Sequence, residues 1–411
     1  MPNSKFKKSL AFLICIFSLV VIGITLSSTI FPALTISKLG ESETTLEPFE
    51  LGVNAYVVLL GNMLLIGFGI LYYKKKLPSL IQSGLTSFLH KNISVKLATI
   101  IILIILIPYT VVTVPELFID ERTQAPDYEI FLAAKKIFPF GQTTFTEASE
   151  QNDRYVRMIL LIASLDIFQN VKIIPFLGSI ALLVTTYFLT KEITQNRLAG
   201  IVSMLILIQS YTFLRYDSFA MYENFWALFY VVSLYVILKK HYLSSISYIL
   251  SILTKAFTAI FLPMSLVFIY FSNITARTKI LITVSYGIMF GVVFAIWTLD
   301  TSVYSNIIRL DPNQLLIAFT KASYQLRFDI LILVTILPLT IALIMKVKQG
   351  VYHAAAIMFL ITGTIFAGPI VEMLSDHFVI LPYRFIPTIV FVAVGVGILF
   401  YKKPISKSSS Q

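Results

Sequence analysis

The fold is decided by stretches such as residues 97–114, which read LATIIILIILIPYTVVTV and contain no charged side chain. A helix of this length rises about 27 Å, close to the roughly 30 Å hydrocarbon thickness of a bilayer. The other long apolar runs are residues 9–36, 54–72, 171–189, 198–214, 225–238, 243–270, 280–297, 330–345, 354–370 and 385–401. Lys255 interrupts residues 243–270, which read as a hairpin of two short helices. The sequence therefore predicts an all-α integral membrane protein, a bundle of about twelve transmembrane helices.

The composition excludes a soluble protein of this size. Hydrophobic residues make up 57% of the 411 residues and charged residues only 13%, whereas soluble domains carry about 45–50% and about 25%. The net charge of +11 does not indicate nucleic-acid binding, because the basic residues form short clusters between the apolar runs. Such clusters set membrane orientation. Membrane lipids are therefore expected partners, and nucleic acid is not.

The basic clusters predict which side of the membrane each loop faces. Those that flank short loops all fall on one side, which the positive-inside rule assigns to the cytoplasm. They are Lys5, Lys7, Lys8, Lys74, Lys75, Lys76, Lys91, Lys96, Lys191, Arg197, Lys239, Lys240, His241, Arg277, Lys279, Lys346 and Lys348, with Lys402, Lys403 and Lys407 in the tail. We expect a multi-pass protein of the cell membrane with both termini in the cytoplasm. Residues 9–36 could instead be a signal peptide, which leaves the later orientation unchanged.

Three regions follow from this pattern. Residues 1–96 hold two N-terminal crossings and a basic loop, residues 97–401 form the main bundle, and residues 402–411 form a cytoplasmic tail. Residues 115–157 are polar and acidic and are expected outside, as is a second polar loop at residues 299–327. Within the first loop, residues 128–138 have helical apolar spacing typical of an interfacial helix. Residues 158–168 are too short to span a bilayer alone.

Ionisable residues gather at the outer ends of the predicted crossings. They are Asp120, Glu121, Asp127, Arg215, Asp217, Glu223, Glu372, Asp376, His377 and Arg384, with Lys255 in its apolar hairpin. A carboxylate there could orient or deprotonate an acceptor hydroxyl. Arg or Lys could stabilise the charge that develops on a phosphate leaving group. This combination favours transfer of a sugar from a polyprenyl-phosphate carrier. Plainer interpretations stay open, since Asp127 could only cap a helix and Arg384 could only snorkel.

Residues 115–401 resemble the GT-C glycosyltransferases, the polytopic group that includes protein O-mannosyltransferases and lipid A aminoarabinose transferases. The resemblance rests on four motifs in a shared order: DYEIFLAAKK at 127–136, SYTFLRY at 210–216 followed by Glu223, LTK at 253–255 and LPYRFIP at 381–387. The chain departs from the group in its two extra N-terminal crossings. It also lacks the Trp-Trp-Asp motif of oligosaccharyltransferases, so the metal dependence of that branch is not implied.

The resemblance implies a role for each site residue. Asp127 would act as the base, although an acidic pair directly after the first family helix would favour Asp120 and Glu121. Arg384 and Tyr383, with Lys255, Arg215 and the second acidic residue, Glu223, would bind the donor phosphate. The expected partners are a polyprenyl-phosphate-sugar donor and a protein, lipid or glycan acceptor on the outer face.

No cofactor is predicted, because four His and the single Cys15 give little material for a zinc site; a divalent metal is left open. Two other functions are also open. A lipid or glycan flippase would place ionisable residues near the bilayer midplane. A GT-C-like subunit without catalytic activity would keep the fold alone.

Overall fold

The computed structural model describes residues 4–34, 49–125, 127–137, 155–239, 242–299, 312–374 and 380–401. Every regular element in these ranges is helical. The α-helices are α1 (Ser4–Ile30), α2 (Ala55–Tyr73), α3 (Ser79–His90), α4 (Val95–Thr113), α5 (Glu121–Gln124), α6 (Asp127–Ile137), α8 (Tyr155–Phe168), α9 (Ile173–Thr194), α10 (Arg197–Ile208), α11 (Tyr211–Tyr216), α12 (Phe225–Leu238), α13 (Ser244–Thr254), α14 (Leu262–Phe271), α15 (Ala276–Leu299), α16 (Pro312–Leu326), α17 (Ile330–Lys348), α18 (His353–Leu374) and α19 (Ile386–Ile398). Short 3₁₀ helices are η1 (Pro32–Leu34), η2 (Val114–Phe118), η3 (Ala256–Phe261) and η4 (Pro382–Phe385).

Among the described residues, 7 helices are long and apolar enough to cross a membrane: α1, α2, α4 with η2, α9, α15, α17 and α18. Shorter apolar helices are α10, α12, α13, η3 with α14, and η4 with α19. The protein is thus an all-α membrane protein, as its sequence predicts. The shorter helices fall within the other predicted crossings, and the total of about twelve stays a prediction.

The outer helices present apolar side chains where a soluble protein would present polar ones. Leu64 of α2 and Val112 of α4 are each 73% exposed, and most of their helical neighbours are exposed too. An apolar surface of this extent is stable only against lipid or another protein. Helical hydrogen bonds satisfy most backbone groups in both helices, as hydrocarbon surroundings require, and Pro108 interrupts this pattern in α4.

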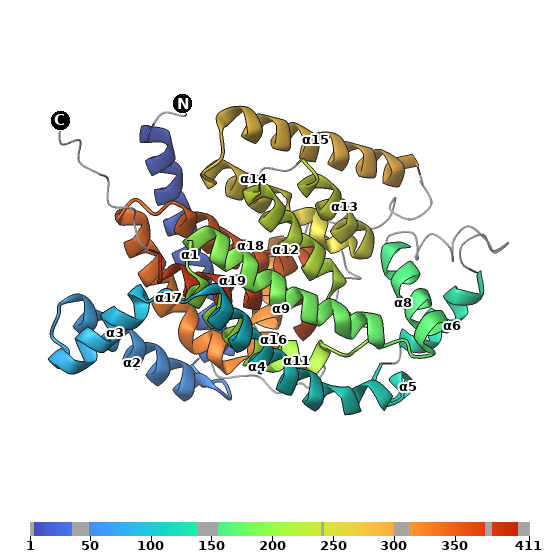
Figure 1. Cartoon of the computed structure of the whole chain (residues 1–411), viewed down its shortest axis with the longest axis horizontal. Helices are drawn as coiled ribbons and strands as arrows, with labels where there is room; N and C mark the ends of the chain where they lie inside the picture. Colours follow the sequence, from blue (N-terminus) through green and yellow to red (C-terminus); the bar gives the residue numbers. More distant parts are fainter. Residues whose placement is uncertain are drawn as a thin grey trace.

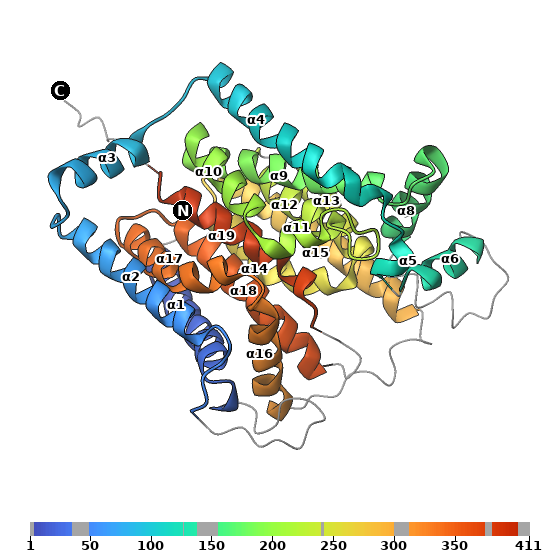
Figure 2. The same cartoon turned by 90° about the horizontal axis from the view of Figure 1, so that it is seen from below.

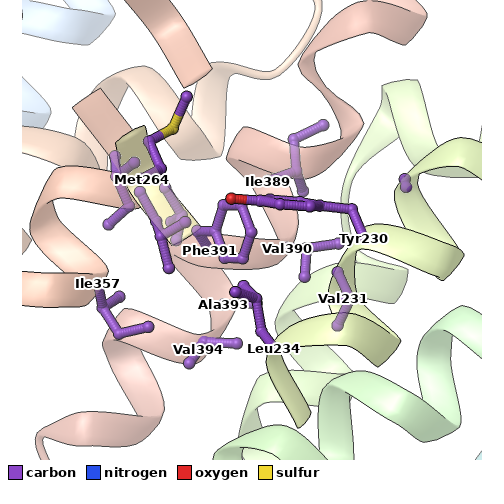
Figure 3. Packing of buried hydrophobic residues seen from close by; sticks show 14 of the residues in the cluster. Tyr230, Val231, Leu234, Met264, Ile357, Ile389, Val390, Phe391, Ala393 and Val394 are labelled. Atoms are coloured by element: carbon purple, nitrogen blue, oxygen red, sulfur yellow. The ribbon is translucent and has the colours of Figure 1, made fainter. Parts of the chain in front are cut away.

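The centre of the bundle is α19, which is buried on every side. A helix that is apolar all round belongs in the interior of a bundle. Figure 3 shows Phe391 of α19 between residues of α12, α14 and α18, including Tyr230 and Met264. The rings of Tyr230 and Phe391 meet edge to face with centroids 5.9 Å apart.

A small residue lets α19 approach α9 and α10 closely. A Cβ at Gly397 would lie 2.5 Å from Ser203 Oγ of α10 and closer still to Thr190 Cγ2 of α9. Small residues at such contacts let membrane helices pack with their backbones near one another. Gly397 therefore sets the spacing of three central helices.

The basic residues that the sequence assigns to the cytoplasm lie at one end of the bundle (Figures 1 and 2). Arg197 at the start of α10 donates to the Ile93 carbonyl at 3.0 Å, and Lys346 of α17 donates to the Tyr401 carbonyl at 3.3 Å. The start of α1, α3 and the end of α19 lie toward this end, whereas α5, α6 and α8 lie toward the other (Figures 1 and 2). The structure thus separates the two loop classes that the sequence assigns to opposite sides.

Two segments that the sequence analysis treats as loops contain helices. α3 lies in the expected basic loop; its Leu80 is 83% exposed, and Phe88 packs edge to face on Phe400. α16 lies in the expected polar loop at 299–327 and packs on α1 and α18 through Phe319 and Ala322. The expected interfacial helix is present as α6, and the short segment at 158–168 belongs to α8.

We expect Gly397→Ala to lower the free energy of unfolding by about 1–3 kcal/mol, because the added methyl group overpacks the contact with α9 and α10. Gly287→Ala is the matched control, since nothing lies within 4 Å of a Cβ at Gly287 in α15, and Ala favours a helix over Gly by about 1 kcal/mol. Thermal unfolding in detergent measures both. Equal stability of the two variants would contradict the close contact.

Candidate functional site

Residues 217–224 join α11 to α12 and form a hub segment, which contacts α5 and α8. One carboxylate oxygen of Glu121, Oε1, accepts hydrogen bonds from the backbone N–H groups of Ala220 and Met221, each at 3.0 Å. The other oxygen, Oε2, lies 3.3 Å from Lys172 Nζ. The side chains of Glu121 and Lys172 are only 2% and 1% exposed. This buried ion pair fixes the hub segment to α5 and to the start of α9.

Further polar contacts hold the beginning of the same segment. Ser218 Oγ donates to Glu116 Oε2 at 3.1 Å, and Ser179 Oγ of α9 donates to the Asp217 carbonyl at 2.8 Å. The Asp217 side chain is buried beside Thr113. Burial, reinforced by the negative charge of Glu116, raises the pKa of the Asp217 carboxyl to about 7.

A second buried ion pair holds the end of the segment. Arg157 Nε of α8 donates to Glu223 Oε2 at 2.9 Å, and the same guanidinium donates to the Met221 carbonyl at 2.8 Å. Both side chains are at least nine-tenths buried. Charged hydrogen bonds of this kind are shorter and stronger than neutral ones. Arg157 thus orients the carboxylate of Glu223.

Stacked tyrosines connect the hub segment to η4. The ring of Tyr222 lies parallel to that of Tyr383 with centroids 4.9 Å apart. Tyr216 of α11 meets each of these two rings edge to face at 5.7 Å. Offset and edge-to-face packing of this kind adds about 0.5–1.5 kcal/mol per pair beyond the buried area.

Two cations lie beside this tyrosine cluster. Lys255 Nζ is 3.8 Å from the centroid of the Tyr383 ring and 5.2 Å from that of Trp226. The guanidinium carbon of Arg384 lies 5.9 Å from the centroids of the Tyr383 and Phe257 rings. Cation–π contacts strengthen when the cation is removed from water.

The backbone explains how Lys255 reaches this position. α13 ends at Thr254, and Lys255 takes an extended conformation with φ −155 and ψ 108 before η3 begins. Tyr248 Oη donates to the carbonyls of Thr258 and Ala259, each at 3.0 Å, which folds η3 back along α13. Lys255 is therefore the tip of a rigid hairpin, as its place in the apolar run predicts.

The carboxylates predicted as catalytic differ in their surroundings. Asp127 is the first residue of α6 and is exposed. The pKa of Tyr222 rises to about 12, mainly because Tyr222 is buried and next because the negative charge of Asp127 is near. Asp120 is exposed and caps α5 by accepting from the Arg122 N–H at 3.0 Å. Glu121 is buried in the ion pair with Lys172. Of these three carboxylates, Asp127 alone is exposed and electrostatically coupled to Tyr222.

The predicted phosphate-binding residues lie mostly together. Lys255, Tyr383 and Arg384 are in contact, and the Glu223 carboxylate is within electrostatic range of Lys255. Arg215 is exposed beside them, with its guanidinium carbon 5.2 Å from the Phe219 ring centroid.

Near the C-terminal end of α18, Glu372 pairs with Lys321 of α16. Asp376 and His377 lie outside the described residues. Within the described residues, no group of three His, Cys, Asp or Glu could hold a metal ion.

Sequence reasoning did not single out Arg157 or Lys172. Arg157 directly precedes the short apolar segment 158–168, and Lys172 lies at the start of the apolar run 171–189. Their signal is weak but present, since an unpaired charge in such a place would be costly.

Comparison with known proteins gives no relative: no protein-family model, no curated protein sequence and no solved structure matches the chain.

We expect Glu121→Gln to lower the free energy of unfolding by about 3–5 kcal/mol, because it leaves the Lys172 ammonium buried without its counter-charge. Glu129→Gln is the control, since the Glu129–Arg122 pair is more than half exposed and such pairs contribute about 0–1 kcal/mol. Chemical or thermal unfolding in detergent compares them. A loss of activity in Glu121→Gln without a loss of stability would contradict the anchoring role.

Asp217 should make stability depend on pH. Its folded pKa of about 7 lies above the ordinary value of 3.8, so the folded state keeps a proton that the unfolded state has released. Stability should therefore fall as pH rises from about 4 to about 7, by up to about 4 kcal/mol. Asp217→Asn should remove this dependence and stabilise the protein above pH 7. Parallel pH profiles of unfolding for both proteins would refute the assignment.

Proposed function

We propose that this protein is a membrane glycosyltransferase that moves a sugar from a polyprenyl-phosphate carrier to a protein, lipid or glycan acceptor. The observation that carries the proposal is the convergence of Lys255, Tyr383 and Arg384 with Glu223 at one end of the bundle. Three separate stretches of chain supply these residues, and each is a break between apolar helices. Charged groups in such positions mark functional sites in membrane proteins.

The orientation of the site is part of the proposal. The basic clusters that border α1 and α3 lie at the opposite end of the bundle (Figures 1 and 2), which the positive-inside rule assigns to the cytoplasm. The site then faces the outer side of the cell membrane, where a carrier lipid keeps its prenyl chain in the bilayer and presents its phosphate at the helix ends.

Electrostatics at the site favour an anionic ligand. The carboxylate of Glu223 acts on Lys255. The same carboxylate forms an ion pair with Arg157, whose Nε lies 2.9 Å from Glu223 Oε2. Lys255 and Arg384 lie close enough to repel each other, so two cations converge beside the Tyr383 ring. Preorganised cations of this kind stabilise the negative charge that grows on a departing phosphate. Tyr383 orients Lys255 through its ring face.

In the proposed reaction, the acceptor hydroxyl oxygen forms a bond to the anomeric carbon of the donor. The bond from that carbon to the phosphate oxygen breaks, and polyprenyl phosphate leaves as a monoester with the bonding electron pair. The hydroxyl proton passes to the Asp127 carboxylate, which is exposed and lies within electrostatic range of Tyr222. We prefer Asp127 to Glu121, whose two oxygens already meet two backbone N–H groups and Lys172, and to Asp120, which caps α5.

The full chain, reconstituted in vesicles, is incubated with a panel of radiolabelled polyprenyl-phosphate sugars and glycan or peptide acceptors. We expect release of polyprenyl phosphate from one of them. Asp127→Asn should slow that release by about 10²–10⁴-fold without loss of donor binding, and Lys255→Gln should weaken both. Asp166→Asn is the control, because Asp166 is an exposed carboxylate of α8 that pairs with Lys135.

Each alternative gives a different result. Full activity in both Asp127→Asn and Asp120→Asn would refute the carboxylate mechanism. Movement of intact donor across the membrane without cleavage would identify a flippase, and neither event with any donor would identify a subunit without catalytic activity.

A further inference from the structure

The basic end of the bundle contains a cluster where α1, α14, α15 and α18 meet. Lys7 Nζ of α1 lies 4.7 Å from the centroid of the Tyr352 ring and 6.0 Å from that of Phe271. Lys279 Nζ of α15 donates to the Tyr270 carbonyl at the end of α14. Both lysines thus reach across to α14, and Lys7 also reaches the start of α18.

The two lysines repel each other. The positive charge of Lys7 acts on Lys279, and both charges act on His353. Neither lysine forms an ion pair with a carboxylate of the described ranges. Like charges held together without a counter-charge are destabilising, so the arrangement favours an anion between them.

A buried imidazole completes the cluster. His353 is the first residue of α18 and is only 6% exposed, and its Nδ1 has no hydrogen-bond partner in the described part of the chain. Buried polar atoms are nearly always satisfied, so an unpaired one needs an explanation. A neutral imidazole can donate one N–H to an anion, and the start of α18 adds the positive end of its dipole.

We propose that Lys7, Lys279 and His353 form a binding site for a phosphate group, carried by the headgroup of an anionic phospholipid or supplied as soluble phosphate. Two ammonium groups and an imidazole match the several acceptor oxygens of a phosphate, and charged hydrogen bonds to it are strong. The rings of Tyr352 and Phe271 form an apolar wall beside it. The site lies at the opposite end of the bundle from Lys255 and does not depend on the proposed transferase function.

The purified full chain in an uncharged detergent is titrated with short-chain phosphatidylglycerol, with phosphatidylcholine of equal chain length and with inorganic phosphate. Thermal stabilisation reports binding. We expect phosphatidylglycerol to bind at least about tenfold more tightly than phosphatidylcholine. Lys7→Gln/Lys279→Gln should weaken that binding by roughly tenfold or more. Lys7→Arg/Lys279→Arg should retain it, which separates loss of charge from misfolding.

The control is Lys74→Gln/Lys76→Gln, which removes the same charge from exposed positions after α2 and should leave affinity within about twofold. Equal binding of the two lipids would overturn the proposal. So would an equal loss in the control pair, because the effect would then be general surface attraction. Stabilisation by millimolar inorganic phosphate that matches phosphatidylglycerol and requires Lys7 and Lys279 supports the site and assigns it a soluble ligand.

Discussion

The buried ion pair between Glu121 and Lys172 is the interaction on which the candidate site depends. The pair is almost fully removed from solvent, and Glu121 also satisfies two backbone N–H groups of the hub segment. A buried pair is stable only when hydrogen bonds satisfy the remaining lone pairs and protons. Lys172 meets that condition with the Glu116 carbonyl and the Gln124 side chain. These contacts tie an irregular segment of chain to α5 and to the start of α9.

The anchored hub segment fixes the positions of residues that belong to the candidate site. Tyr222 and Glu223 follow the anchored backbone of Met221, so their positions are set by Glu121 and Arg157 and need no contact with a ligand. Tyr222 then supports Tyr383, and Tyr383 supports Lys255. Preorganised sites of this kind need little rearrangement when charge develops. The polar and aromatic contacts around the hub segment therefore form one connected unit.

The sequence predicts the helices well where apolar periodicity is strong and the site where a charge interrupts an apolar run. Lys255 stands out in this way, and Arg384 stands out because it directly precedes the last apolar run. A charge in either place has few structural explanations. The partners of Glu121 and Glu223 are not, since pairing with Lys172 and Arg157 depends on how separate helices pack. The sequence does not predict α3, because no charged residue marks one face of that helix as polar. It does not predict α16, because polar residues such as Lys321 suggest a loop.

The short central helices place the charged groups at a particular depth. α12, α13 and α19 have 14, 11 and 13 residues, so each rises only about 16–21 Å, against a hydrocarbon slab of roughly 30 Å. Longer helices such as α9, α15 and α18 surround them. In the proposed membrane orientation, Lys255 and Arg384 would lie below the level of the lipid headgroups, where the local dielectric constant is low and Coulomb forces reach several times their strength in water. An anionic headgroup that binds them would then leave the aqueous interface, and the fixed charges of the bundle would replace its lost hydration.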